Sequence, residues 1–347
     1  MQMKDHFFDT SKQFDMTELE LDKLPAGKIS LGSIDLFSDA AHRITSLPLM
    51  VAKGAREGPT LGLLAVVHGN ELNGIMTIHQ LFSELDPELL SGNIVAIPVV
   101  NMHGYLTKQR FFIDSKDLNR VMPGKEYGTP SEIYAYRLMN RIIKYFDYMI
   151  DIHTASFGRV NSHYIRADLR HPTIRKMAEL QDAEIIVNTR KPLNSFRGAA
   201  TNAGIPSITI ELGNPQLFQR SMVNSGIEGI INVLVNFAMY PAEIRQEKET
   251  VICSHSYWIR VDQGGVLYVY PDLCDKIKKG QIIGRLTDIF GQQIKEFESP
   301  ADGIVVGKST NPVTYTGGRI LHIGIIGDID SADADLEDEH EDIDDDY

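Results

Sequence analysis

The pattern of hydrophobic and polar positions changes abruptly at His68. The run before it, LGLLAVV (61–67), is apolar apart from one glycine, and such a run is typical of a buried strand. After His68 come a Gly-Asn turn, Glu71, and a segment whose apolar residues recur at helical spacing, namely Ile75, Ile78, Leu81, Phe82 and Leu85. His68 and Glu71 are therefore expected on the turn between a buried strand and a helix, where ligands collect in open α/β sheets.

Two later apolar runs end in the same way. Residues 148–152 lead directly to His153, and residues 207–210 lead to Glu211. Strands that alternate with helical segments indicate a mainly parallel sheet. Because the carboxyl ends of parallel strands lie along one edge, we expect these two residues to converge with the turn at His68.

Further elements complete a predicted α/β domain over residues 46–245. A proline within the strand at 44–52 suits an edge strand, and the long segment 101–128 is expected to be a packed functional loop. Residues 1–45 give weak patterns and are expected to pack on this domain. The remaining predictions are strands at 93–100 and 183–188 and helices at 129–146, 171–180 and 217–239.

From residue 251 the pattern changes to short β runs separated by Gly and Asp turns. Spacing of this kind predicts a small all-β domain over residues 250–327. The polar segment 241–250 marks the expected boundary, and residues 328–347 form a separate acidic tail.

The net charge of −13 is unevenly placed. Residues 328–347 contain twelve Asp and Glu and no Lys or Arg, so the remaining chain sums to −1. A nearly neutral body argues against nucleic acid as a partner. The tail is expected to be disordered and solvated.

Composition also bears on the cellular setting. No apolar run approaches the ~20 residues that span a bilayer, and residues 1–15 lack the apolar core of a secretory signal. Only Cys253 and Cys274 are present, which indicates a reducing cytoplasm. We expect a small-molecule substrate and no membrane partner, and a symmetric homo-oligomer is a common state for cytoplasmic enzymes.

The converging residues suit a hydrolytic zinc site. Ligands from His68, Glu71 and His153 leave a fourth position for water, whose pKa zinc lowers from 15.7 to roughly 7. Glu211 is the candidate to accept the proton and pass it to the leaving group. The structural alternatives are hydrogen-bonded histidines at strand ends and a glutamate that only caps a helix.

The loop at 101–128 supplies further candidates. Arg110 can stabilise an oxyanion, Asn119 and Arg120 suit a substrate carboxylate, and Asp117 can accept the second N–H of His68. The alternative is that these residues only tie the loop down through salt bridges. Six other histidines lack a partnering pattern and are expected to be structural or exposed: His79, His103, His163, His171, His255 and His322.

The motifs resemble those of the succinylglutamate desuccinylase and aspartoacylase family, which is related to the zinc carboxypeptidases. The resemblance covers residues 44–327 and rests on HGNE (68–71), Asn101 with Arg110, DLNR (117–120), DIHT (151–154), RGAATNAGIP (197–206) and ITIELG (208–213). The C-terminal region is also similar to lipoyl and biotinyl carriers, but TDIFGQQIKE (287–296) lacks the Met-Lys of a carrier hairpin. A swinging-arm cofactor is therefore not expected.

The resemblance implies a carboxypeptidase-like α/β domain with a mixed, mainly parallel sheet flanked by helices, followed by a barrel-sandwich-like β domain. It implies one zinc ion on His68, Glu71 and His153, Glu211 as general base and acid, Arg110 polarising the carbonyl, and Asn119, Arg120 and Arg197 binding substrate carboxylates.

The predicted function is zinc-dependent removal of an acyl group from an N-acyl amino acid or a similar small amide that bears a carboxylate. A metallocarboxypeptidase acting on short peptides uses the same ligands and stays open as an alternative. A non-catalytic binding protein with the same fold is a weaker one, because Glu211 and Arg110 are not needed to hold a metal.

Overall fold

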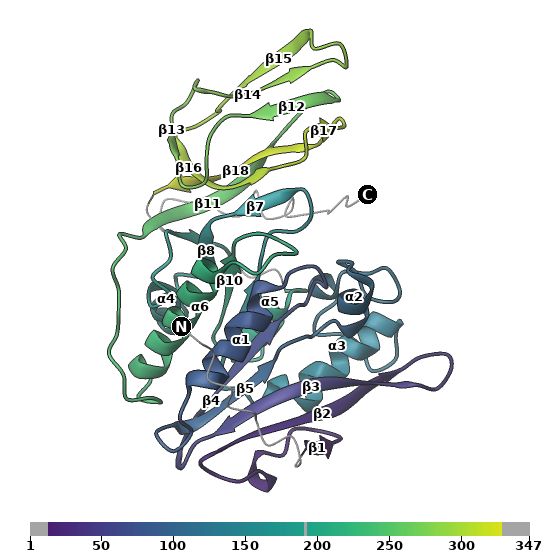
Figure 1. The fold of residues 1–347 in the computed structure, drawn as a ribbon, viewed down its shortest axis with the longest axis vertical. Coiled ribbons are helices and arrows are strands. Elements are labelled where there is room, and N and C mark those ends of the chain that lie inside the picture. Colours follow the sequence, from purple (N-terminus) through teal and green to yellow (C-terminus); the bar gives the residue numbers. More distant parts are fainter. Residues whose placement is uncertain (1–12, 191–192, 328–347) are drawn as a thin grey trace.

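The computed structural model of the protein describes residues 13–190 and 193–327. It shows an α/β region and, stacked at one end of it, an all-β region (Figure 1). The helices are α1 (Asn73–Glu84), α2 (Met102–Thr107), α3 (Pro130–Arg141), α4 (Pro172–Glu179), α5 (Phe196–Asn202) and α6 (Arg220–Asn236), with 3₁₀ turns at Leu21–Lys23, Leu118–Arg120 and Ile143–Tyr145.

The described part of the α/β region contains ten strands and contributes most of the large sheet. They are β1 (Gln13–Met16), β2 (Lys28–Ser38), β3 (Ile44–Lys53), β4 (Arg56–Ala65), β5 (Ser91–Ile97), β6 (Tyr148–His153), β7 (Arg159–Asn161), β8 (His163–Ala167), β9 (Ile185–Asn188) and β10 (Ser207–Leu212). The central order β5-β4-β6-β10 is parallel throughout, whereas β3 and β8 on either side of it run antiparallel. The predicted mixed, mainly parallel sheet is confirmed.

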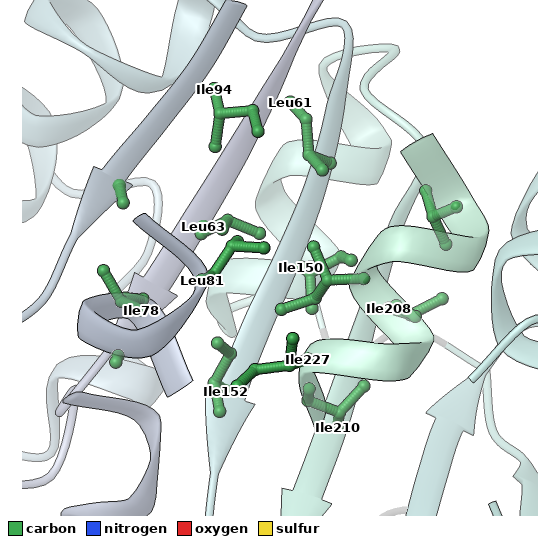
Figure 2. Packing of buried hydrophobic residues seen from close by; sticks show 14 of the residues in the cluster. Leu61, Leu63, Ile78, Leu81, Ile94, Ile150, Ile152, Ile208, Ile210 and Ile227 are labelled. Atoms are coloured by element: carbon green, nitrogen blue, oxygen red, sulfur yellow. The ribbon is translucent and has the colours of Figure 1, made fainter. Parts of the chain in front are cut away.

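Helices cover both faces of this sheet. On one face α1, α4 and α6 pack against the central strands, and on the other α3 and α5 do so. Full burial of a Leu or Ile side chain contributes about 1.5–3 kcal/mol, so this core holds the strand ends firmly. Figure 2 shows the first face, where the labelled residues are Leu61, Leu63, Ile78, Leu81, Ile94, Ile150, Ile152, Ile208, Ile210 and Ile227.

The all-β region continues the large sheet. Strand β11 pairs in parallel with β9, and β18, β16 and β13 follow it, while β15, β14, β12 and β17 form a second, antiparallel sheet (Figure 1). The strands are β11 (Val251–Arg260), β12 (Gly265–Val269), β13 (Lys276–Ile277), β14 (Ile282–Thr287), β15 (Gln293–Glu298), β16 (Gly303–Ser309), β17 (Val313–Thr314) and β18 (Arg319–Ile326). A separate apolar cluster lies within this region.

One local expectation was wrong, and two segments contain elements that the sequence patterns did not predict. The weakly patterned N-terminal segment contains β2, which pairs with β3 along its whole length. Strand β3 is therefore not an edge strand, but it pairs with β5 only over residues 50–53, so Pro48 lies where one side of the strand has no ladder to break. The loop 101–128 contains the short helix α2, which Asn101 caps by accepting a hydrogen bond from Gly104 N–H.

Other expectations concern residues at the chain ends. Residues 1–12 and the acidic segment 328–347, which was expected to be disordered, lie outside the described residues. Among the residues that the structure does describe, no helix is long and apolar enough to cross a membrane.

Candidate active site and metal centre

The first candidate ligands lie on a tight turn after β4. Val66 has φ = 55°, a conformation that β-branched residues rarely adopt. The chain beyond β5 holds it there, because Asn101 N–H donates to the Val66 carbonyl at 2.9 Å. Gly69 packs so closely that a Cβ at this position would overlap the backbone of Gly104. The HGNE motif thus meets a steric requirement as well as a chemical one.

Glu71 is the centre of the buried polar cluster. Its Oε1 lies 2.7 Å from Nδ1 of His68, and its Oε2 lies 2.9 Å from Nδ1 of His153. Oε2 also accepts from the backbone N–H of Thr154, and Oε1 from the hydroxyl of Ser156, each at 3.2 Å. One ligand atom from each of the two histidines and the glutamate can be chosen so that all lie within 4.8 Å of one another, so this group can hold a metal ion.

A carboxylate lies behind each imidazole. Nε2 of His68 is 3.1 Å from Oδ1 of Asp117, the contact expected for that residue. Nε2 of His153 is 2.9 Å from Oδ2 of Asp151, although the angle is not that of a hydrogen bond. A carboxylate on Nε2 fixes the ring and leaves Nδ1 to act as a ligand.

The cluster stabilises its own charges. Burial opposes ionisation of Glu71, but the charges of His68 and His153 outweigh burial and hold the pKa of the Glu71 carboxyl well below its usual range. Burial also opposes the charged form of His153, yet Asp151 and Glu71 raise the pKa of that imidazole well above its usual value. A buried carboxylate here is stable only with positive charge on both sides.

Arg110 joins the predicted loop to this cluster. Its guanidinium donates to Oδ2 of Asp117 at 2.8 Å and to the hydroxyl of Ser156 at 2.9 Å, and lies 3.4 Å from Oε1 of Glu71. The Asn101 amide donates to the Arg110 carbonyl at 3.2 Å. Burial opposes ionisation of Asp117, but Arg110 and His68 keep its pKa well below the usual range.

Glu211 lies opposite His153 in the register of β10 and β6. Its Oε2 accepts a hydrogen bond from Nδ2 of Asn161 at 3.1 Å, and its Oε1 lies 3.9 Å from Nε of Arg166. Burial raises the pKa of Glu211 to about 7, against the opposing charges of His153 and Arg166. A carboxyl with this pKa can both accept and donate a proton near neutral pH.

One pocket brings eight of the predicted residues together, and Asp117 lies behind it against His68. Among the residues that the structure describes, its lining includes five arginines, at 110, 120, 159, 166 and 197, but only two acidic residues, Glu71 and Glu211. The pocket therefore favours a ligand with negative charge.

The three predicted substrate-binding residues line this pocket while also making protein contacts. Asn119 Oδ1 accepts from Phe196 N–H at 2.9 Å, and Arg120 donates to the Asn119 carbonyl at 3.0 Å. Arg197 donates to the hydroxyl of Thr189 at 2.9 Å. Their groups are thus held in place before any ligand binds.

Eleven lining residues were not predicted from the sequence, and six of these lie on strands that carry no predicted site residue. Four lie on β7 and β8, where alternate residues face the pocket, and two come from β11 and β18 of the all-β region; they are Arg159, Asn161, Tyr164, Arg166, Trp258 and His322. His322 was expected to be structural or exposed, but it is buried in the wall and stacks on Trp258 at a centroid distance of 5.1 Å. Alternation of polar residues at 159, 161, 164 and 166 is the signal that the sequence offered.

Comparison with known proteins finds related sequences. Residues 57–236 match the model of the succinylglutamate desuccinylase/aspartoacylase catalytic domain. The chain is 24% identical over 294 residues to N-alpha-acetyl-L-2,4-diaminobutyric acid deacetylase of Halomonas elongata, covering 78% of this chain and 83% of that protein.

Solved structures share the fold over nearly their whole length. A succinylglutamate desuccinylase/aspartoacylase from Rhodobacter sphaeroides superposes with a TM-score of 0.79 at 23% identity, covering 89% of this chain and 98% of the other. The product-bound ectoine utilization protein EutE (DoeB) from Ruegeria pomeroyi gives 0.78 at 20% identity, covering 87% and 98%. Because the family model matches residues 57–236, more than half of the chain, the chain belongs to the succinylglutamate desuccinylase/aspartoacylase family.

Proposed function

We propose that this protein is a zinc-dependent amidohydrolase that removes the acyl group from an N-acyl amino acid or a similar small amide bearing a carboxylate. The observation that carries the proposal is the convergence of His68, Glu71 and His153 beside Glu211, in one pocket rich in arginine. Membership of a family of deacylating enzymes supports the same reaction.

The donor set fits zinc. Two imidazole nitrogens and one carboxylate oxygen are the ligands of many catalytic zinc sites, which keep a further position open. Without an ion, the charge of Glu71 is balanced by the two imidazoles, whose pKa values are raised. A divalent cation would supply the same two positive charges and leave both rings neutral, as ligation requires.

The ion would supply a Lewis acid and lower the pKa of water toward neutrality. Glu211 accepts one proton of the attacking water and transfers it to the amide nitrogen as the C–N bond breaks. The second proton of that water passes from the new carboxyl group to the released amine, so the products are a carboxylate and a protonated amine. Arg110, held by Asp117, donates to the carbonyl oxygen as negative charge develops there.

The remaining arginines point to the substrate class. Arg120 and Arg197, with Asn119, line the pocket and suit a carboxylate on the amino acid part of the substrate. Trp258 and His322 from the all-β region close part of the wall. A small acyl amino acid fits this enclosure better than the end of a long peptide.

The test combines metal analysis with a substrate panel. Purified protein should contain about one zinc per chain, since all three ligands come from one chain. It should release amine from N-acetyl or N-succinyl amino acids and lose activity with a chelator. Faster hydrolysis of unblocked dipeptides would instead favour a carboxypeptidase, and chelator-insensitive turnover without bound metal would contradict the proposal.

A further inference from the structure

We propose that the all-β region takes part in catalysis by holding Asn161 against Glu211 through the pairing of β16 with β7. Asn161 is then a positioning residue for the general base, and Gly307 on β16 is the residue that makes room for it. This inference rests on the proposed function, because it takes Glu211 as the base.

The position of β7 is set from the all-β region. This strand is three residues long, and among the described strands its sheet partner is β16, with Gly307 opposite Asn161. Two further backbone hydrogen bonds, of 2.8 and 3.0 Å, join the residues flanking β7 to Thr310 and Val306. A strand this short has no stability of its own, so its pairing with β16, together with β8 one residue further along the chain, determines where its side chains lie.

The side chains of β7 alternate between two environments. Arg159 and Asn161 are buried and line the pocket, whereas Val160 between them does not. Nδ2 of Asn161 donates to Oε2 of Glu211 at 3.1 Å. This bond fixes the orientation of the carboxylate and leaves Oε1 to exchange the proton.

Glycine is needed at position 307 because it leaves space for the side-chain amide of Asn161. It does not adopt a positive φ, so backbone conformation does not require glycine here. A Cβ at this position would lie 2.5 Å from Oδ1 of Asn161 and 3.1 Å from the Val160 carbonyl. The side-chain amide can move away more easily than the backbone, so a methyl group at position 307 would push Asn161 off Glu211.

The first experiment is Asn161→Ala, assayed on the best substrate of the panel. We expect kcat to fall about tenfold to a hundredfold, the value of one hydrogen bond to a charged group. KM should stay within about twofold, and zinc content and melting temperature should not change. If KM rises while kcat is unchanged, Asn161 binds substrate instead and the inference is wrong.

The second experiment acts from the all-β region. Gly307→Ala should lower kcat by a similar factor without touching the substrate, and it should have no further effect in an Asn161→Ala background. Lys308→Ala is the matched control, because the Lys308 ammonium contacts Pro271 and Asp272 rather than the pocket. A further loss of kcat in the double variant, or normal kcat in folded Gly307→Ala, would overturn the inference. If Gly307→Ala lowers the melting temperature too far for assay, the kinetics of Asn161→Ala alone decide whether Asn161 positions Glu211.

Glu211→Gln, assayed in parallel, separates this inference from the proposed function. If Glu211→Gln abolishes turnover and Asn161→Ala keeps full kcat, the positioning role fails and the proposed function stands. If the wild-type protein hydrolyses no amide of the panel, both fail.

Discussion

Two sides of the pocket are held in place by different means. The strand-end side is formed by His68, Glu71 and His153, and the β7 side is formed by Arg159 and Asn161. The strand-end residues follow central parallel strands that have neighbours on both sides and helices on both faces. The β7 residues lie on a three-residue strand that pairs with the all-β region. Changes in the all-β region should therefore leave metal binding unaffected, but they should alter the orientation of the Glu211 carboxylate.

The largest expected effect is on the strand-end side. His153→Ala removes one of the three candidate protein ligands and the imidazole that contacts Oε2 of the buried Glu71 carboxylate. Zinc content should fall well below one per chain, and kcat/KM should fall about 10⁴-fold or more. Metal analysis and kinetics check this. Full zinc occupancy in this variant would mean that the ion binds elsewhere.

Glu211→Gln should have the next largest effect. The amide keeps the shape of the side chain but cannot accept a proton, so kcat should fall by about 10²–10⁴, the contribution of general acid–base catalysis. Zinc content should remain at the wild-type value, because Glu211 is not among the candidate ligands. Unchanged turnover would remove Glu211 from the mechanism.

The two sides also differ in how far the sequence predicts them. His68, His153 and Glu211 each end an apolar run, and three such runs in a parallel sheet must place their ends together, so their convergence followed from periodicity. Asn161 follows no apolar run, and its role depends on the pairing of β7 with a strand far along the chain. No local pattern encodes that register, and the same holds for His322, which reaches the pocket through β18.

A third prediction concerns stability at the joint between the two regions. His163 on β8 is buried, and neither ring nitrogen has a hydrogen-bond partner among the described residues. Glu184 lies 3.9 Å away but is paired with Lys248, which offsets its charge. Burial, assisted by Lys248, lowers the pKa of His163 to about 3.

The sign of the pH effect follows from that shift. Below about pH 6.5 His163 is protonated in the unfolded chain, whereas in the native state it stays neutral down to about pH 3. The free energy of unfolding therefore decreases as pH falls through this window. Between pH 7 and 5 the wild type should lose about 2 kcal/mol more than His163→Leu, measured by urea unfolding. The exposed-residue control, His42→Asn, should behave as wild type. Equal losses in wild type and His163→Leu would show that this imidazole is not buried in its neutral form.

The smallest expected effect concerns Trp258 and His322, the two lining residues from the all-β region. The prediction is that these residues contribute to substrate affinity but not to the rate of the chemical step. Trp258 stacks on His322, whose Nε2 lies 2.8 Å from the Ser256 hydroxyl, so the indole both lines the pocket and holds its neighbour. Trp258→Ala should raise KM about three- to tenfold, the value of one aromatic contact, with kcat and zinc content unchanged. Trp258→Phe keeps an aromatic face and should recover most of the affinity. A fall in kcat with unchanged KM would place Trp258 with Asn161 among the residues that position Glu211. In that case β7 would not differ in role from the lining residues of the all-β region.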